Sequence, residues 1–296
     1  MNSFKTIGLV GRQGNPQVVE SVVAAAAYLT QRGIRLVVEE GTAAMLSPCS
    51  HPVKSRSALG KMCDLILVVG GDGSLLGVAR DFAESGLPVL GINRGGLGFL
   101  ADISPDHLEQ QLGEVLDGQY TIEKHFLLSL ELQRRAECIG RSTALNDVVL
   151  HAGTMSRMME FSLSIDAEFV YEQRSDGLIV ASPTGSTAYA LSAGGPIMHP
   201  SLDAIVIVPM FPHTLTSRPL VVQGSSEIRV VVGDSTTPQP RISCDSQVDL
   251  AVLPGDEAVI RKARHSLNLV YPLEHSFYGS CRQKLDWASR LGGKVN

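Results

Sequence analysis

Several features that mark whole classes of protein are missing from this 296-residue sequence. No apolar run reaches the 18 residues that a membrane-spanning helix needs, and the N-terminus lacks the basic and apolar regions of a secretory signal. The net charge of −5 gives no electrostatic reason to bind nucleic acid or an anionic membrane surface. We therefore expect a cytoplasmic protein whose partners include neither nucleic acid nor a membrane.

Cysteine is also sparse. The five cysteines contain no Cys-x-x-Cys pair and leave one residue over if they pair. This pattern is typical of reduced thiols in a cytosol, and it disfavours both a disulfide framework and a zinc site. With 44% hydrophobic and 19% charged residues, the chain is long enough for one large or two ordinary globular domains.

The pattern of apolar residues changes along the chain. Over residues 1–124, short apolar runs such as TIGLVG and DLILVVGG alternate with helical spacing, which predicts an α/β domain with a doubly wound, mostly parallel sheet. Over residues 125–275, apolar and polar residues alternate between turn residues, which predicts a β-rich, mostly antiparallel domain. Residues 276–296 return to helical spacing and form a C-terminal tail that could pack on the first domain.

The segment VVGGDGS places one carboxylate, Asp72, among three glycines at the end of an apolar run. Open α/β sheets bind phosphates at such a junction between a strand and a helix. The segment lacks the lysine of a Walker A loop and the G-x-G-x-x-G spacing of a dinucleotide fingerprint, so another group must balance the phosphate charge. A carboxylate there suits a Mg²⁺ ligand or a general base in phosphoryl transfer. Alone, the segment is equally consistent with a tight turn whose Asp caps a helix.

Two later segments carry side chains suited to a nucleoside. Asn146 offers a donor and an acceptor for an adenine edge, and Asp147 can accept from ribose hydroxyls, although Asn-Asp by itself is more typical of a turn. The segment ASPTGSTAYALS follows an apolar run with short polar side chains that suit a loop around a polar ligand. It lacks the G-x-S-x-G elbow of a serine hydrolase, which disfavours that activity.

In combination, GGDGS, GINRGGLGFLAD, LNDVVLH and RSDGLIVASPTGSTAYALSAGGP resemble the NAD kinases, in particular the proteobacterial type. The likeness covers nearly the whole chain. It implies transfer of a phosphoryl group from ATP, or in some members inorganic polyphosphate, to the 2′-hydroxyl of the adenosine ribose of NAD. It also implies a divalent cation, with Mg²⁺ favoured, and a homodimer or homotetramer.

The resemblance also implies roles for individual residues. Asp72 is the implied catalytic base, and Asp176 is implied to contact the nicotinamide end of NAD. The implied phosphate-donor loop consists of Gly70, Gly71, Gly73 and Ser74. The implied NAD-binding residues are Asp72, Gly73, Asn146, Asp147, Arg157, Arg174, Asp176, Thr187, Ala188, Tyr189, Ala190, Leu191, Ser192 and Gln247.

One turn departs from the family pattern. Many members have Asp-Gly-Gln where this chain has Asp245-Ser246-Gln247, so the turn cannot use glycine to reach a positive φ. The resemblance still implies that Gln247 lines the pocket.

Two other functions are alternatives to an NAD kinase. Lipid and sphingoid-base kinases share a G-G-D-G segment and a β-rich second domain, but they need an apolar acceptor pocket, whereas this chain offers Asn146-Asp147 and a Ser/Thr-rich loop. A module that senses NAD or NADP without turnover would not need the carboxylate of Asp72. An activity assay separates these functions.

Overall fold

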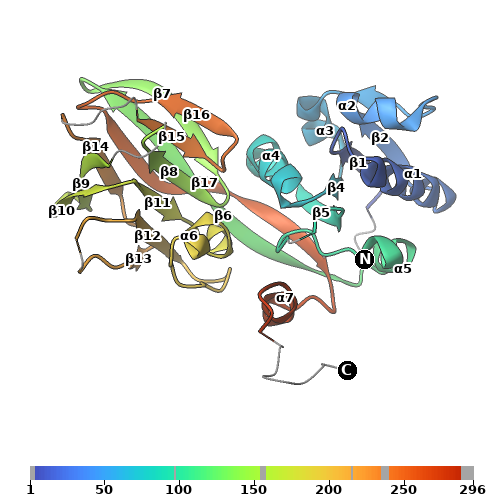
Figure 1. The fold of residues 1–296 in the computed structure, drawn as a ribbon. Helices are drawn as coiled ribbons and strands as arrows, with labels where there is room; N and C mark the ends of the chain where they lie inside the picture. The colour runs from blue at the N-terminus through green and yellow to red at the C-terminus, as the bar shows by residue number, and fades with distance from the viewer. Residues whose placement is uncertain (1–3, 97, 154–157, 215, 235–239, 288–296) are drawn as a thin grey trace. The chain divides into compact units, whose positions relative to one another are not determined.

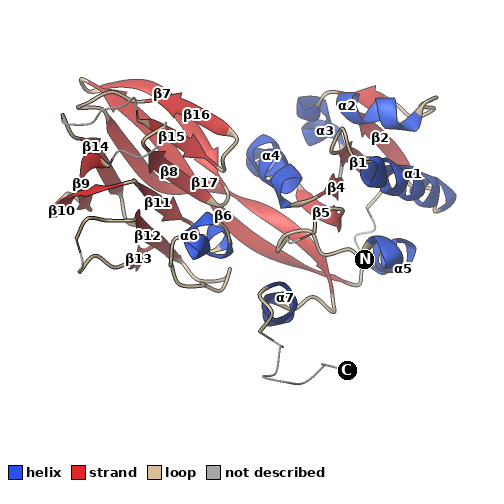
Figure 2. Ribbon diagram, in the orientation of Figure 1, coloured by secondary structure: helices blue, strands red, loops and turns tan. Residues whose placement is uncertain are grey.

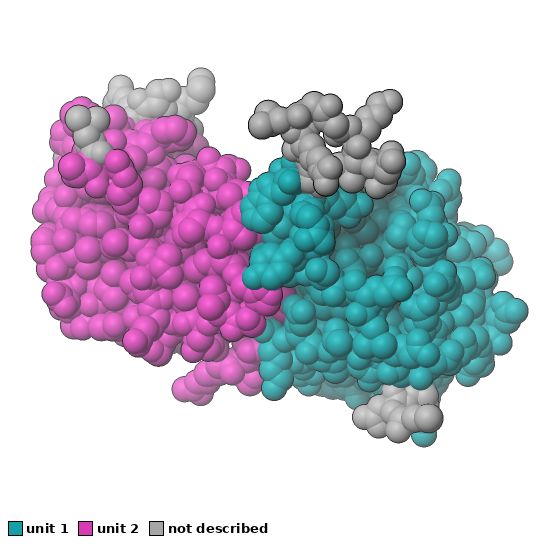
Figure 3. All heavy atoms as spheres, turned by 90° about the horizontal axis from the view of Figure 1, so that it is seen from below, with its two compact units in different colours: residues 1–124, 267–296 teal, residues 125–266 magenta. Residues whose placement is uncertain are grey.

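The computed structural model describes residues 4–96, 98–153, 158–214, 216–234 and 240–287. The chain divides into two compact units, residues 1–124 with 267–296, and residues 125–266 (Figure 3). The sequence placed the end of the second domain at 275, eight residues beyond the point where the first unit resumes. That point lies inside one continuous strand, β17 (Glu257–Pro272), so no turn residue marks it in the sequence.

The first unit is built on a parallel sheet in the order β3-β2-β1-β4-β5 (Figure 1). Its strands are β1 (Thr6–Gly11), β2 (Arg35–Glu39), β3 (Val53–Lys54), β4 (Leu65–Gly70) and β5 (Pro88–Asn93). Residues 268–270 of β17 add a further parallel pairing to β5. All six residues of β4 are buried, as expected for a parallel strand that is covered on both faces.

Helices α1 (Pro16–Gln31), α2 (Glu40–Ala43), α3 (Arg56–Met62) and α4 (Asp72–Phe82) lie between successive strands, which confirms the predicted α/β class. Helix α5 (Leu108–Leu116) follows β5, α7 (Phe277–Lys284) follows β17, and short 3₁₀ turns lie at 44–46, 83–85 and 105–107. The start of α1 follows from its sequence: Asn15 accepts from the N–H of Gln17, and Pro16 occupies the first turn. Val18, Val22 and Leu29 then bury one face of α1 in a core shared with β1, β4 and α5.

The second unit contains two antiparallel sheets, which confirms the predicted β-rich class (Figure 2). One sheet contains β6 (Tyr120–Arg134), β7 (Glu137–Ala144), β9 (Met159–Ile165), β10 (Glu168–Ser175), β14 (Ile228–Val232) and the first part of β17. The other has the order β13-β12-β11-β8-β15-β16. Its strands are β8 (Asp147–His151), β11 (Gly177–Ala181), β12 (Ala204–Met210), β13 (Leu220–Gln223), β15 (Arg241–Cys244) and β16 (Val248–Ala251).

The two sheets of this unit share one apolar core. Leu130 of β6 and Phe161 of β9 pack in the same cluster as Val148 of β8 and Ile207 of β12. A 3₁₀ turn, η4 (Thr184–Thr187), and a short helix, α6 (Tyr189–Ser192), follow β11. Among the residues that the structure describes, no helix is long and apolar enough to cross a membrane.

Candidate functional site

Asp72 stands at the carboxyl end of β4 as the first residue of α4, at the position that the sequence predicted for a phosphate-binding loop. Its carboxylate is fixed by a second loop, 27 to 29 residues further along the chain. Oδ2 accepts from the backbone N–H of Phe99 at 2.6 Å. Oδ1 accepts from the N–H groups of Leu100 at 3.1 Å and Ala101 at 3.4 Å. Three backbone donors therefore hold this carboxylate in one orientation.

Glycine is required where this second loop meets the carboxylate. A Cβ on Gly98 would lie 2.4 Å from Oδ1 of Asp72, and a Cβ on Gly71 would lie 3.2 Å from the Cα of Gly95. The backbone of the second loop is also tied to β4, because the N–H of Arg94 donates to the carbonyl of Gly70 at 2.9 Å. These glycines let two loops of the protein approach each other.

Further charged groups lie near Asp72 within the same unit. Nδ1 of His275 is 3.1 Å from Oδ2 of Asp102, and the His275 ring stacks on Tyr271 with centroids 3.8 Å apart. Full burial raises the pKa of Tyr271 well above its ordinary value, and the negative charges of Glu123, Asp102 and Asp72 add to that effect. The surroundings of Asp72 are therefore rich in carboxylates.

The hydroxyl of Ser74, in the first turn of α4, is buried and has no hydrogen-bond partner. A buried oxygen without a partner is costly unless something else occupies its lone pairs or takes its proton. In a loop of this kind, a phosphate oxygen or a metal ion supplies such a partner.

In the second unit, Asn146 and Asp147 form the turn that enters β8, and Asp245 holds that turn in place. Oδ2 of Asp245 accepts from the N–H of Leu145 at 2.9 Å. Oδ1 accepts from the N–H groups of Asn146 at 2.8 Å and Asp147 at 3.3 Å. Burial, together with the negative charge of Asp245, raises the pKa of Asp147 to about 7. This carboxyl group therefore changes charge close to neutral pH.

The loop after β11 packs against the same turn. The N–H of Ser182 donates to the carbonyl of Asn146 at 2.9 Å, and its hydroxyl donates to the carbonyl of Leu145 at 2.5 Å. A Cβ on Gly185 would lie only 2.1 Å from the carbonyl oxygen of Asn146, so no other residue fits there without moving the backbone.

The short polar side chains of this loop form hydrogen bonds within the protein, whereas the sequence suggested contacts with a ligand. Ser182 and Ser186 are fully buried. The hydroxyl of Ser186 donates to the carbonyl of Pro183 and accepts from the N–H of Met198. Thr184 Oγ1 lies 2.8 Å from Nδ1 of His125. The hydroxyl of Thr187 also donates to the carbonyl of Thr184, at 3.2 Å, so these groups hold the loop together.

The other implied binding residues of the second unit occupy varied positions. Tyr189 is 44% exposed on α6, and Ser192 at the end of α6 lines a hollow of about 240 Å³ with Met210 and Phe211. Half-buried residues are Thr187, Ala188, Leu191 and Asp176, exposed residues are Arg174 and Gln247, and Ala190 is buried. Arg157 lies outside the described residues.

Arg174 pairs with a carboxylate of the protein. Its Nε lies 3.3 Å from Glu160 Oε2, on the neighbouring strand β9. The turn that precedes Gln247 has positive φ at both Asp245 and Ser246, so a residue other than glycine does occupy the left-handed region there.

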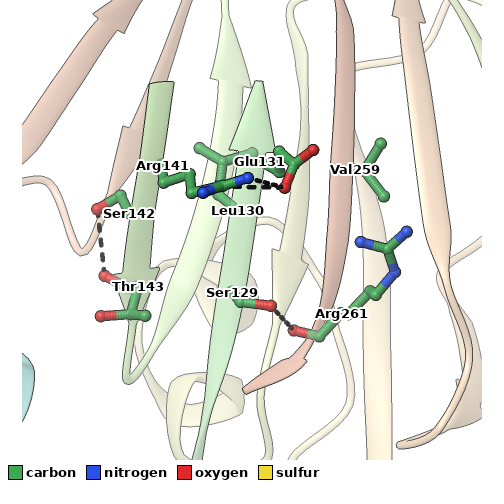
Figure 4. A pocket seen from close by; sticks show the side chains of 8 residues that line it. All are labelled: Ser129, Leu130, Glu131, Arg141, Ser142, Thr143, Val259 and Arg261. Atoms are coloured by element: carbon green, nitrogen blue, oxygen red, sulfur yellow. Dashed lines mark hydrogen bonds and ion pairs between the residues drawn. The ribbon is translucent and has the colours of Figure 1, made fainter. Parts of the chain in front are cut away.

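A second hollow of about 360 Å³ in this unit lies between β6, β7 and β17 (Figure 4). Arg141 and Glu131 form an ion pair across it, and the hydroxyl of Ser129 donates to the carbonyl of Arg261. None of the residues that the sequence predicted for the site lines this hollow.

Sequence reasoning missed two residues near these groups. Asp245 was noticed only as part of an unusual turn, although its carboxylate holds the turn at Asn146. Lys284 of α7 was not considered, although its Nζ lies 5.3 Å from the centroid of the Phe99 ring.

A carboxylate held at the carboxyl end of a parallel α/β sheet, beside a buried hydroxyl without a partner, fits the phosphate-binding site of a nucleotide-binding enzyme. Comparisons with known proteins make this specific. Residues 7–120 match the model of the ATP-NAD kinase N-terminal domain, and residues 145–271 match that of the ATP-NAD kinase C-terminal domain. The NAD kinase of Azotobacter vinelandii is 55% identical over 99% of both chains, and that of Pseudomonas syringae pv. syringae is 54% identical over the same shares.

Solved structures agree with the sequence comparisons. The yeast NADH kinase complexed with NADH has a TM-score of 0.88 at 27% identity, covering 99% of this chain and 91% of that one. An Archaeoglobus fulgidus NAD kinase in complex with ATP shares the fold, with a TM-score of 0.75 at 23% identity over 95% of this chain and 98% of that one. The chain therefore belongs to the NAD kinase family, and it is an enzyme that uses ATP to phosphorylate NAD to NADP.

Proposed function

We propose that Asp72 is the general base of this reaction, which takes the proton from the 2′-hydroxyl of the adenosine ribose as that oxygen attacks the γ-phosphorus of ATP. The observation that supports this role is the fixed carboxylate at the start of α4, held by the N–H groups of Phe99 and Leu100. A secondary hydroxyl is a poor nucleophile at neutral pH, so a positioned base contributes about 10²–10⁴-fold. Positioning of the two substrates contributes the rest.

We propose that Asn146 and Asp147 bind the adenosine of NAD through hydrogen bonds. The turn is rigid, because Asp245 accepts hydrogen bonds from three consecutive N–H groups beneath it. An amide suits an adenine edge, and an ionised carboxylate accepts hydrogen bonds from ribose hydroxyls. A fixed turn loses little conformational entropy on binding, which favours a specific contact.

The remaining implied residues complete the proposed pocket. The segment from Thr187 to Ser192 lines it, and Asp176, Arg174 and Gln247 contribute from neighbouring strands and turns of the second unit. In the yeast relative the bound nucleotide is NADH, which supports a dinucleotide as the ligand of this fold.

We propose Mg²⁺ as the metal. No group of three or more acidic, histidine or cysteine side chains that could hold a metal exists among the described residues. Mg²⁺ in phosphoryl transfer is commonly held by one or two protein oxygens together with substrate phosphates, so a dedicated cage is not required. The partnerless hydroxyl of Ser74 is an oxygen that fits this arrangement. Such a metal would neutralise charge on the donor phosphates.

We also propose that the enzyme works in the cytoplasm as a homodimer or homotetramer. All five cysteines are free thiols, which is consistent with a reducing compartment. Light scattering of the purified protein at several concentrations measures the number of chains, and a monomer at micromolar concentration would contradict the oligomer.

The activity is tested by incubating the purified protein with NAD, ATP and Mg²⁺ and measuring the product with an NADP-specific dehydrogenase. We expect NADP to accumulate and the reaction to stop when a chelator removes Mg²⁺. Tight NAD binding without product would favour the sensing module. A protein that neither binds NAD nor makes NADP, but phosphorylates a sphingoid base, would favour the lipid kinase.

A further inference from the structure

The site around Asp72 has an excess of negative charge. The negative charges of Asp72 and Asp102 both raise the pKa of Tyr271, which lies in the same unit. ATP would bring several more negative charges to the same place. The glycine-rich segment contains no lysine, unlike a Walker A loop. Its one arginine, Arg94, is engaged elsewhere: Nε donates to the hydroxyl of Ser21 at 2.7 Å, and Glu20 lies 3.8 Å away. Cations from other parts of the chain are available: Arg12 follows β1 and its Cβ lies 3.3 Å from where a Cβ on Gly70 would be, and the C-terminal helix supplies Lys284.

Helix α7 brings such a cation to the site. The helix is capped by Ser276, whose hydroxyl accepts from the N–H of Gly279 at 3.1 Å, and it buries Cys281. Lys284 follows Cys281 by three residues, so it lies on the same side of the helix. Its Nζ lies 5.3 Å from the centroid of the Phe99 ring, and the backbone N–H of Phe99 is the donor closest to Asp72.

The electrostatics of Lys284 differ from those of a surface lysine. Burial lowers its pKa, while the negative charges of Asp72 and Asp102 act in the opposite direction and favour the ammonium form. Arg282, in the same last turn, is exposed. Both residues complement the dipole at the end of the helix, and the charges of Asp72 and Asp102 act on Lys284.

We infer that Lys284 is the cation that holds the phosphates of ATP beside Asp72, a role that rests on the proposed function of Asp72. The aromatic face of Phe99 supports the ammonium group without neutralising it, because a cation over a ring keeps its full charge. When ATP binds, the ammonium group donates hydrogen bonds to its phosphate oxygens. It also offsets the repulsion between those phosphates and the carboxylates of Asp72 and Asp102.

The test compares three variants with the wild type. Lys284→Met removes the charge and keeps the length of the side chain, Lys284→Arg keeps the charge, and Arg282→Met removes a charge from the same helix turn as a matched control. For each we would measure kcat/KM for ATP at saturating NAD, the KM for NAD, and the affinity for ATP by calorimetry.

We expect Lys284→Met to lower kcat/KM for ATP by about 10-fold to 100-fold, the range of one hydrogen bond to a charged group. The KM for NAD should stay within about twofold, Lys284→Arg should recover much of the loss, and Arg282→Met should resemble the wild type. A Lys284→Met enzyme with wild-type kcat/KM for ATP would overturn the inference. So would an equal loss toward both substrates that arginine fails to rescue, because that pattern indicates a structural role.

These outcomes are separable from a failure of the proposed function. If Asp72→Asn keeps the kcat of the wild type, the proposed role of Asp72 fails, and the calorimetric affinity for ATP still decides the role of Lys284. Equal ATP affinity in the wild type and Lys284→Met would then overturn it, and a loss of about tenfold or more would support it.

Discussion

Replacement of Asp147 by asparagine should stabilise the protein, and more so at high pH. Burial and the charge of Asp245 raise the pKa of Asp147 from 3.8 to about 7 in the folded protein. Above pH 3.8 the unfolded chain releases this proton, whereas the folded chain keeps it until about pH 7. The folded state therefore binds more protons in this window, and its stability falls as pH rises through it.

The size of the effect follows from the shift. Each pKa unit corresponds to about 1.4 kcal/mol, so a shift of about three units destabilises the folded state by roughly 4 kcal/mol above pH 7. Between pH 5.5 and pH 8 the wild type should lose roughly 2 kcal/mol relative to Asp147→Asn, because the folded carboxyl group keeps its proton over about 1.5 units of that range, up to about pH 7, while the unfolded one has already lost it.

The assay is urea unfolding of wild type and Asp147→Asn at pH 5.5 and pH 8, with Asp249→Asn as the control. Asp249 is exposed on β16, and its carboxylate forms an ion pair with Arg241. The difference in unfolding free energy between Asp147→Asn and wild type should grow by roughly 2 kcal/mol from pH 5.5 to pH 8, and the control should change far less. Equal differences at both pH values would refute the reasoning. The same variant should bind NAD more weakly, because an amide accepts fewer hydrogen bonds than a carboxylate.

Three further substitutions test the geometry of the two sites. Ser246→Gly should raise the unfolding free energy by about 1 kcal/mol, because Ser246 has φ of 54° and glycine adopts this conformation without strain; no change in the urea midpoint would contradict this. Gly98→Ala should lower kcat by about 100-fold with little change in NAD affinity, because its Cβ would lie 2.4 Å from Asp72 Oδ1; wild-type kcat would show that the contact is easily relieved. Asp245→Asn should raise the KM for NAD about tenfold, because an amide cannot accept through its nitrogen and the turn at Asn146 loses a fixed partner; an unchanged KM would separate that turn from substrate binding.

The fold was predictable because it depends on local patterns. Short apolar runs with helical spacing between them specified the parallel sheet, and alternating residues specified the antiparallel strands. The second boundary could not be placed, because β17 runs through it with no turn residue.

The site was predictable in its residue types but not in its contacts. GGDGS indicated a carboxylate at a phosphate-binding junction, but the donors that fix Asp72 lie in a loop 27 residues away. The serines of the loop after β11 look like ligand contacts in the sequence. Ser182 and Ser186 instead bond to backbone groups, and only the folded structure shows that those partners are near. Lys284 lies 212 positions from Asp72, so no spacing rule connects them.

The measurement that tests the central role of Asp72 most directly is a comparison of wild type and Asp72→Asn in kcat for NADP formation and in calorimetric affinity for NAD. Asparagine is similar in size and shape to aspartate but is not a base, and only its amide oxygen can accept from the loop N–H groups. We predict a loss of about 10²-fold or more in kcat, with NAD affinity within a few-fold of the wild type. A variant that keeps most of its kcat, or that loses NAD affinity in proportion to its rate, would contradict the assignment of Asp72 as the base.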